Sequence, residues 1–180
     1  MVALPFTRQI ADPVDFTPPG IFNLRDKVVK DTRPHTTFCK QLAEYVVLYS
    51  LWQMAADEIQ NYEGQPGLTF IENVPTNWQR TVIAMAEIGK YIMTAREDRN
   101  SSNWFIVGMT DENARDITLK FNFLDASATY KATIYRDGVD ADYGTAPYAM
   151  EIDRQTVDVS SQLRIHIARS GGFAIQLIKQ

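Results

Sequence analysis

The chain is poor in the residue types on which metal binding, disulfide bonding and acid–base catalysis usually depend. Its 180 residues include one cysteine, Cys39, and two histidines, His35 and His166. A single cysteine excludes an internal disulfide, and so few Cys and His residues exclude a Cys/His zinc site. A glycine-rich phosphate loop and a serine nucleophile motif are also absent from the sequence. We expect Cys39 to be a small buried apolar residue.

Positive charge and long apolar runs are scarce as well. The chain has 18 Lys and Arg residues against 22 Asp and Glu, which gives a net charge of −4. This balance argues against a nucleic acid or an anionic membrane as the partner. No apolar run approaches the roughly 20 residues of a membrane-spanning helix. Residues 1–10 contain Pro5 and Arg8 and no apolar core segment, so we expect no signal peptide within the chain.

The strongest helical pattern predicts a single helix over residues 37–59, with Thr36 as its N-cap. Apolar residues cover most of its circumference, so such a helix must be buried on several sides. Residues 1–75 alone offer too little to cover it, and we therefore expect it to need a partner outside the chain. The helical spacing rests on Phe38, Leu42, Tyr45, Val46, Tyr49, Trp52 and Ala56, and the wider stripe on Val47, Leu48, Leu51 and Met54.

The remaining part of the first 75 residues gives weaker signals. Residues 4–7 are short and apolar and could end a buried strand, with Pro5 at its edge. Residues 68–74 predict a short helix that stops at Pro75. We place a boundary between two parts of the chain at residues 75–78, because the apolar period changes there from 3.6 to 2 residues.

Residues 79–180 predict an antiparallel β-sandwich of about eight strands. Gly89-Lys90 reads as the turn of a hairpin. The connections are too short for parallel crossovers, so the strands must pair mostly antiparallel. Apolar residues alternate with polar ones, and such a sheet buries its apolar face against a second sheet. The candidate strands are residues 81–88, 91–96, 104–109, 116–123, 129–136, 148–152, 157–159, 163–167 and 173–177.

Few residues qualify as candidates for chemistry. His35 reads as a loop residue, and His166 alternates with buried isoleucines and so faces solvent. Asp137, Asp140 and Asp142 slightly resemble a calcium loop, but no glutamate closes it at the required distance, so we interpret them as a surface turn. The sequence predicts no catalytic residue and no metal ligand.

Eight short motifs in consistent order together resemble the C-terminal part of glycoside hydrolase family 97, a group of α-glycosidases. The first three are similar to the end of the catalytic barrel and its last helix, and the others to the C-terminal domain and the entry into it. The motifs are Leu4-Pro5-Phe6-Thr7-Arg8, Asp15-Phe16-Thr17-Pro18, Gln41-Leu42-Ala43-Glu44-Tyr45-Val46-Val47, Val74-Pro75-Thr76-Asn77-Trp78, Gly89-Lys90-Tyr91-Ile92 with Ala95-Arg96, Trp104-Phe105-Ile106-Val107-Gly108, Ile134-Tyr135-Arg136-Asp137-Gly138-Val139-Asp140-Ala141 and Gly171-Gly172-Phe173-Ala174.

The resemblance implies an α+β fragment: residues 1–75 as the C-terminal remnant of a catalytic (β/α)8 barrel, and residues 76–180 as a C-terminal antiparallel β-sandwich. It implies that the catalytic carboxylates and the glutamates that hold a calcium ion lie upstream of Leu4. Only Arg8 and Asp15 remain as candidates for the rim of the substrate site. The partners implied are the missing barrel and N-terminal domain, an oligosaccharide substrate bound by the parent enzyme, and a second copy in a homo-oligomer. The resemblance also implies a periplasmic location for the parent protein.

The predicted function is therefore the C-terminal portion of an exo-acting α-glycosidase that cleaves α-glucosides, inactive alone, with a structural or oligomerising sandwich. α-Galactosides are the alternative substrate. A different class of function, a free-standing carbohydrate-binding or oligomerisation module, stays open. Its stacking faces would come from Trp104, Tyr130, Tyr135 and Tyr148, although strand alternation places Trp104 and Tyr130 inward.

Overall fold

A large antiparallel sheet forms the middle layer of the chain in the computed structural model, which describes residues 1–17 and 33–180. Its strand order is β1-β2-β3-β8-β5-β6, and each neighbouring pair is antiparallel. The predicted hairpin is confirmed, since β1 and β2 flank Gly89. The two weak candidates at residues 148–159 form one strand, β6. The bounds are β1 Trp78–Glu87, β2 Tyr91–Asp98, β3 Trp104–Thr110, β5 Tyr130–Asp137, β6 Met150–Val157 and β8 Gly172–Lys179.

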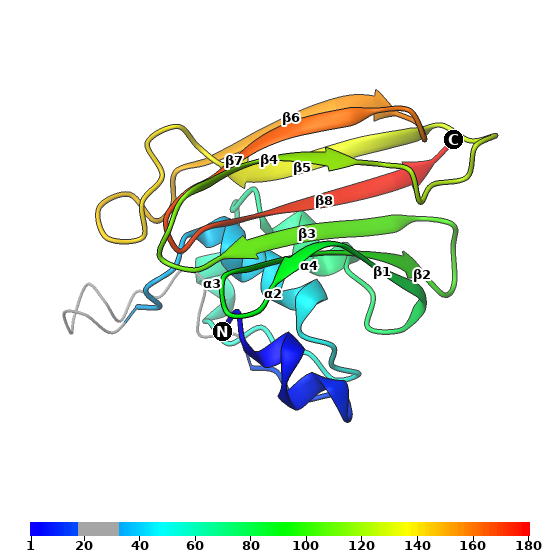
Figure 1. Cartoon of the computed structure of the whole chain (residues 1–180). Coiled ribbons are helices and arrows are strands. Elements are labelled where there is room, and N and C mark those ends of the chain that lie inside the picture. The colour runs from blue at the N-terminus through cyan, green and yellow to red at the C-terminus, as the bar shows by residue number, and fades with distance from the viewer. Residues whose placement is uncertain (18–32) are drawn as a thin grey trace.

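A second sheet of two strands, β4 (Arg115–Lys120) and β7 (Gln162–Ile167), covers one face of the large sheet (Figure 1). Along β4, Ile117 and Leu119 are buried while the residues between them are exposed. The apolar side chains of the two sheets form one buried cluster between them, as the alternation predicted. Its largest fully buried members are Trp104, Tyr130, Phe121, Phe173, Met93, Ile106 and Leu119.

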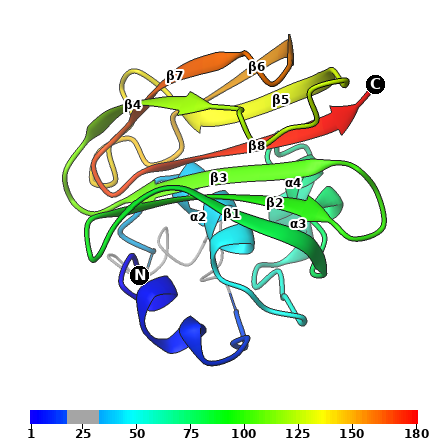
Figure 2. The same ribbon diagram turned by 45° about the vertical axis from the view of Figure 1, so that its right-hand side comes forward.

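The helices lie against the opposite face of the large sheet (Figures 1 and 2). Helix α2 spans Phe38–Val47, and all ten of its residues are buried. It packs on β3 and β8, and its apolar side chains join Phe105, Val107 and Ala174 in a second buried cluster. Strand β3 is therefore buried on both faces, which explains its uninterrupted apolar run.

Three predictions about this helix were wrong. It begins after Thr37, whose hydroxyl caps it by accepting from Lys40 N (3.3 Å), and not after Thr36. It ends at Val47 instead of Ile59, because side chains take up its last carbonyls: Gln53 Nε2 donates to Tyr45 O (2.5 Å) and Arg96 Nη2 to Val47 O (3.3 Å). The chain then runs without helix to the short α3 (Ile59–Tyr62). Helix α2 also needs no outside partner, because the sheet of its own chain covers it. Leu51 and Trp52, in contrast, are exposed.

The N-terminal segment folds into two short 3-10 helices, η1 (Leu4–Phe6) and η2 (Arg8–Ile10), so the strand predicted at residues 4–7 was wrong. Pro5 suits the first turn of a helix, where no N–H is required. The short helix predicted at residues 68–74 is confirmed as α4 (Leu68–Asn73). Part of one predicted motif, Pro18, lies outside the described residues.

The predicted division at residues 75–78 falls between α4 and β1, yet both sides share one core. Phe70 of α4 packs against Phe105 and Tyr135 with ring centroids 5.9 Å and 5.6 Å apart. The helical layer is thus built onto the sheet. Among the described residues, no helix has the length and apolar character that crossing a membrane requires.

Candidate functional site

A groove beside the N-terminal 3-10 helices brings Arg8 and Asp15 together. Both residues line it, and its volume is about 760 Å³. The other lining residues are Met1, Leu4, Gln9, Pro13, Val14, Phe16, Thr17 and Leu48. The side chains that the sequence suggested as a rim therefore share one hollow, while their role in binding substrate stays a prediction.

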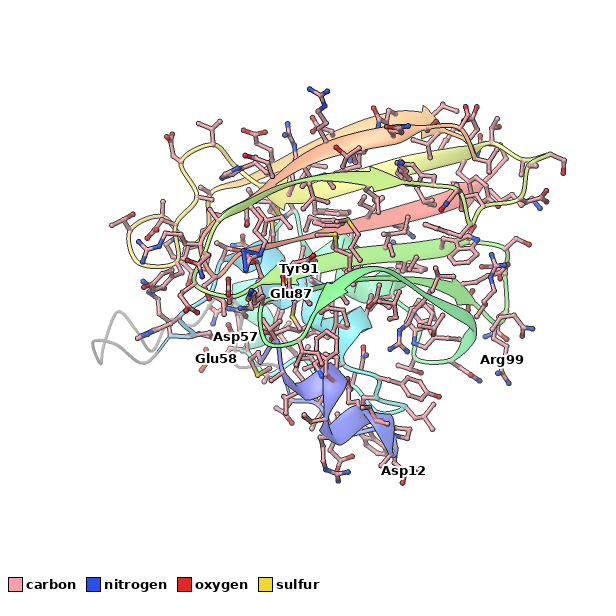
Figure 3. The ribbon with its side chains drawn as sticks, viewed as in Figure 1. Asp12, Asp57, Glu58, Glu87, Tyr91 and Arg99 are labelled. Atoms are coloured by element: carbon pink, nitrogen blue, oxygen red, sulfur yellow. The ribbon has the colours of Figure 1, made fainter. Side chains whose placement is uncertain are left out.

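The strand-like segment that carries Asp15 is held against the chain that follows α2. Val14 N donates to Tyr49 O (3.0 Å), and Phe16 forms a parallel bridge with Gln53. The Phe16 ring is buried and meets Tyr45 edge-on at 5.8 Å. Figure 3 shows Asp12 at the far end of this segment, away from the strands. Asp15 lines the groove, whereas Asp12 is not among the lining residues.

The described residues that line the groove do not include the pair of carboxyl groups that cleave a glycosidic bond. Glycoside hydrolysis uses two carboxyl groups, about 5–9.5 Å apart, on either side of the sugar linkage. Asp15 is the one carboxylate side chain among the described residues that line this groove. The described lining of the groove therefore offers one carboxylate, that of Asp15, together with the guanidinium of Arg8.

A buried polar cluster joins α2 to the ends of β3, β5 and β8. Asp137 is 3% exposed, and its Oδ2 accepts from Ala168 N (3.0 Å) and Gly172 N (2.9 Å). Burial raises the pKa of Asp137, and its hydrogen bonds partly lower it again. The prediction of a surface turn was wrong for this residue. It was right for the exposed Asp140, and Asp142 is half-buried.

Helix α2 contributes two further buried charged groups. Lys40 Nζ donates to Thr110 O (2.8 Å) and Ser170 Oγ (3.3 Å). Glu44, one turn later, is 1% exposed, and its Oε1 has no hydrogen-bond partner in the described part of the chain. Burial raises the pKa of Glu44 to about 7, against the lowering effect of Lys40. Both side chains are therefore part of the buried interior of the described structure.

The remaining candidates behave as the sequence suggested. Cys39 is buried, and burial raises the pKa of its thiol, so it is not a reactive thiolate. The ring of His166 is about half exposed and its Nδ1 lies 2.8 Å from Asp116 Oδ1. His35 is exposed in its loop. The described residues hold no group of three or more His, Cys, Asp or Glu side chains suited to a metal ion.

The four aromatic residues proposed as stacking faces offer little surface to a sugar. Trp104 and Tyr130 are each 1% exposed, which confirms their inward orientation, and Tyr135 is 2% exposed. Only Tyr148, at 49%, is open to solvent among the four candidates. Three of the four predicted stacking faces are therefore part of the core.

The described residues form a β-sandwich with a helical layer packed on it, and the described lining of the groove contains no pair of carboxylates. Residues 77–178 match the family described as "Glycosyl-hydrolase 97 C-terminal, oligomerisation". This match covers more than half of the sequence, so the chain belongs to glycoside hydrolase family 97, as the motifs indicated. Arg8 and Asp15 lie outside the matched residues.

Two curated proteins are similar to nearly the whole chain. A retaining α-galactosidase of Bacteroides thetaiotaomicron is 34% identical over 181 residues, which cover 98% of this chain and 27% of that protein. A probable retaining α-galactosidase of Streptomyces bingchenggensis is 26% identical over 97% of this chain and 25% of its own length. The chain therefore spans about a quarter of the length of these relatives.

Solved structures agree with this placement. A family 97 enzyme from Pseudoalteromonas sp. strain K8, solved in complex with panose and with acarbose, is 40% identical and superposes with a TM-score of 0.92. The match covers 99% of this chain and 28% of that enzyme. A β-arabinopyranosidase shares the fold at a TM-score of 0.71 and 21% identity.

Proposed function

We propose that this chain forms the C-terminal part of an exo-acting α-glycosidase. Residues 1–75 would complete its catalytic barrel, and residues 76–180 would be a structural and oligomerising sandwich. The observation that carries the proposal is the superposition of 99% of the chain on 28% of a family 97 enzyme, with helical layer and sandwich included. The shared core of the two layers supports it, because the helical layer is anchored to the sheet.

In this proposal, the chain has no glycosidase activity alone. The paired carboxylates and the calcium-binding glutamates would come from the parent enzyme, a periplasmic protein. Arg8 and Asp15 would stand at the rim of the substrate site, since both line one groove. A guanidinium beside a carboxylate suits a sugar, whose hydroxyl groups both donate and accept hydrogen bonds.

We propose α-glucosides as the substrate class. The relative with 40% identity binds panose, a trisaccharide of α-linked glucose, whereas the α-galactosidases share 34% and 26% identity. α-Galactosides remain the alternative, because the groove described here contains only part of the site that would read the sugar.

A reconstitution experiment tests the proposal. The Pseudoalteromonas enzyme is truncated by the matched 28% of its length and mixed with this chain. We expect each part alone to leave aryl α-glucosides and aryl α-galactosides intact, and the mixture to release the aryl group from the α-glucoside. Turnover by this chain alone that EDTA abolishes would contradict the proposal, as would a failure of the two parts to bind.

A further inference from the structure

The two edges of the large sheet differ in how they face solvent. Edge strand β6 carries Glu151 and Asp153, and both pair with Arg136 of β5 at 2.8 Å. At the opposite edge, residues 81–86 of β1 form a run without any charged side chain. Charged residues on an edge strand discourage pairing with another chain, while an uncharged edge invites it. Only β1 therefore has the character of a contact surface.

Exposed apolar side chains gather on β1 and in the turn after it. Ile83, Met85 and Ile88 are 51%, 38% and 72% exposed. Ile83 lies opposite Thr94 and Met85 opposite Met93, so the two side chains lie on different faces of the sheet. Strand β1 is thus apolar and open on the helix side, on the β4 side and at its end.

A groove runs between β1 and β4, on the side of the sandwich where both strands have an open edge. Its volume is about 460 Å³, and Val82, Ala84, Met85, Leu119 and Phe123 supply its apolar lining. In the described sheets β4 pairs with β7 alone, and β1 with β2 alone. The groove can therefore receive apolar side chains from outside.

Arg80 fixes the shape of this groove. Its Nη2 donates to Phe123 O (2.6 Å), which links β1 to the segment after β4. Its guanidinium also lies 4.6 Å from the centre of the Trp104 ring. The two walls are consequently held at a set distance in the single chain, and a partner meets a preformed surface.

We infer that the open edge of β1 and the β1–β4 groove, together the β1 edge surface, form the contact between two copies of this chain. The inference rests on the proposed function, because the family description assigns oligomerisation to residues 77–178, and it adds the surface. A two-fold contact uses the same patch on both copies. With a net charge of −4 per chain, an uncharged strip is the surface where two copies repel least.

The contact is made mainly by side chains. Two register shifts interrupt β1, one between Trp78 and Arg80 and one between Ile83 and Met85. Such bulges bend an edge strand and prevent a long ladder of backbone hydrogen bonds with a neighbour. Ile83, Met85 and Ile88 of one copy would instead pack against the groove of the other.

Analytical ultracentrifugation of the whole 180-residue chain and four variants tests the inference. We expect the wild-type chain at about 100 μM to sediment as a dimer, within the range of weak homodimers. The double variant I83K/M85K should dimerise about tenfold or more weakly, because a buried contact would have to accept unpaired ammonium groups. V139K makes the matched control: Val139 is 83% exposed in the turn after β5, and its variant should dimerise like the wild type.

Thermal melting of each variant shows whether it folds. If I83K/M85K does not fold, the variant I88K, which changes the exposed turn after β1, takes its place. A wild-type monomer would overturn the inference, as would a folded β1 variant that dimerises normally. The variant L51K/W52K changes a second exposed apolar surface, formed by Leu51 and Trp52. If the dimer is lost in this variant and kept in the β1 variants, the inference is also overturned. A monomeric β1 variant that still restores activity to the truncated enzyme leaves the proposed function intact. Failure of the inferred dimer contact can therefore be told apart from failure of the proposed function.

Discussion

The two faces of the large sheet are buried by different chemistry. On the face covered by β4 and β7, the buried cluster consists of apolar side chains. On the face covered by α2, the chain also buries the charged residues Lys40, Glu44 and Arg96. Burial lowers the pKa of Lys40 and lowers that of Arg96 to about 10, as it raises that of Glu44. The stability of the sandwich layer therefore comes from apolar surface removed from water. The stability of the helical layer depends on polar contacts as well.

The largest expected effect concerns the apolar face. Phe173 is fully buried between the sheets, and its ring lies against Gly108 of β3. Substitution F173A should lower the free energy of unfolding by about 4 kcal/mol, because it removes a large apolar side chain and leaves a cavity. Urea unfolding measures the loss. V139A, at an exposed apolar site, should change stability by less than about 0.5 kcal/mol, and an equal effect of both variants would contradict the account.

The next effect concerns the buried carboxylate of Asp137, which holds the turn between β7 and β8. D137A leaves the N–H groups of Ala168 and Gly172 without an acceptor and should cost about 2 kcal/mol. A side chain at Gly171 would collide with the same carboxylate, so this turn is built around Asp137. The control is D140A in the exposed turn. Equal stability of the two variants in urea would show that Asp137 does not anchor the turn.

A smaller effect should appear in the pH dependence of stability. Burial raises the pKa of Glu44 from 4.5 to about 7. Between these pH values the folded chain keeps a proton that the unfolded chain releases, so the free energy of unfolding falls as pH rises from 4.5 to 7. E44Q should weaken this dependence, because the amide of glutamine does not titrate in this pH range. Urea unfolding at pH 5 and pH 7.5 gives the change in the free energy of unfolding between these pH values. The control is E63Q, at an exposed position. If E44Q shows the same change with pH as the wild type and E63Q, the prediction is refuted.

The smallest expected signal is sugar binding by the chain alone. With Trp104, Tyr130 and Tyr135 in the core, Tyr148 is the remaining open ring of the four candidates. Calorimetric titration with maltose and melibiose at millimolar concentrations should give no saturable heat. A saturable signal that disappears in Y148A would instead favour a carbohydrate-binding module.

The sequence predicted the strands well because their side chains alternate with the sheet. Ile117 and Leu119 are buried between exposed neighbours, and the pattern shows this without any tertiary information. The end of α2 was not predictable in that way. Residues 48–58 keep helical spacing, while the contacts that end the helix come from Gln53 and from Arg96, which lies 49 residues beyond Val47.

The same limit applies to the buried polar groups and to the site. Asp137 looked like part of a solvated turn, because its acceptor role depends on the N–H groups of residues 31 and 35 positions further along the chain. Arg8 and Asp15 share a groove because segment 14–16 pairs with residues 49–53, which short-range pattern does not reveal. One signal was available in the sequence. The unbroken apolar run of β3 indicated a strand buried on both faces, and therefore a sheet face that could bury α2.

The most direct measurement for the account is the activity of a chimera in which this chain replaces the matched 28% of the Pseudoalteromonas enzyme. If the chain is the C-terminal part of such a glycosidase, the chimera should hydrolyse an aryl α-glucoside with a kcat/KM within about tenfold of the parent enzyme, a loss of about 1.4 kcal/mol in transition-state stabilisation. A chimera that folds, binds the substrate and shows no turnover would contradict the account.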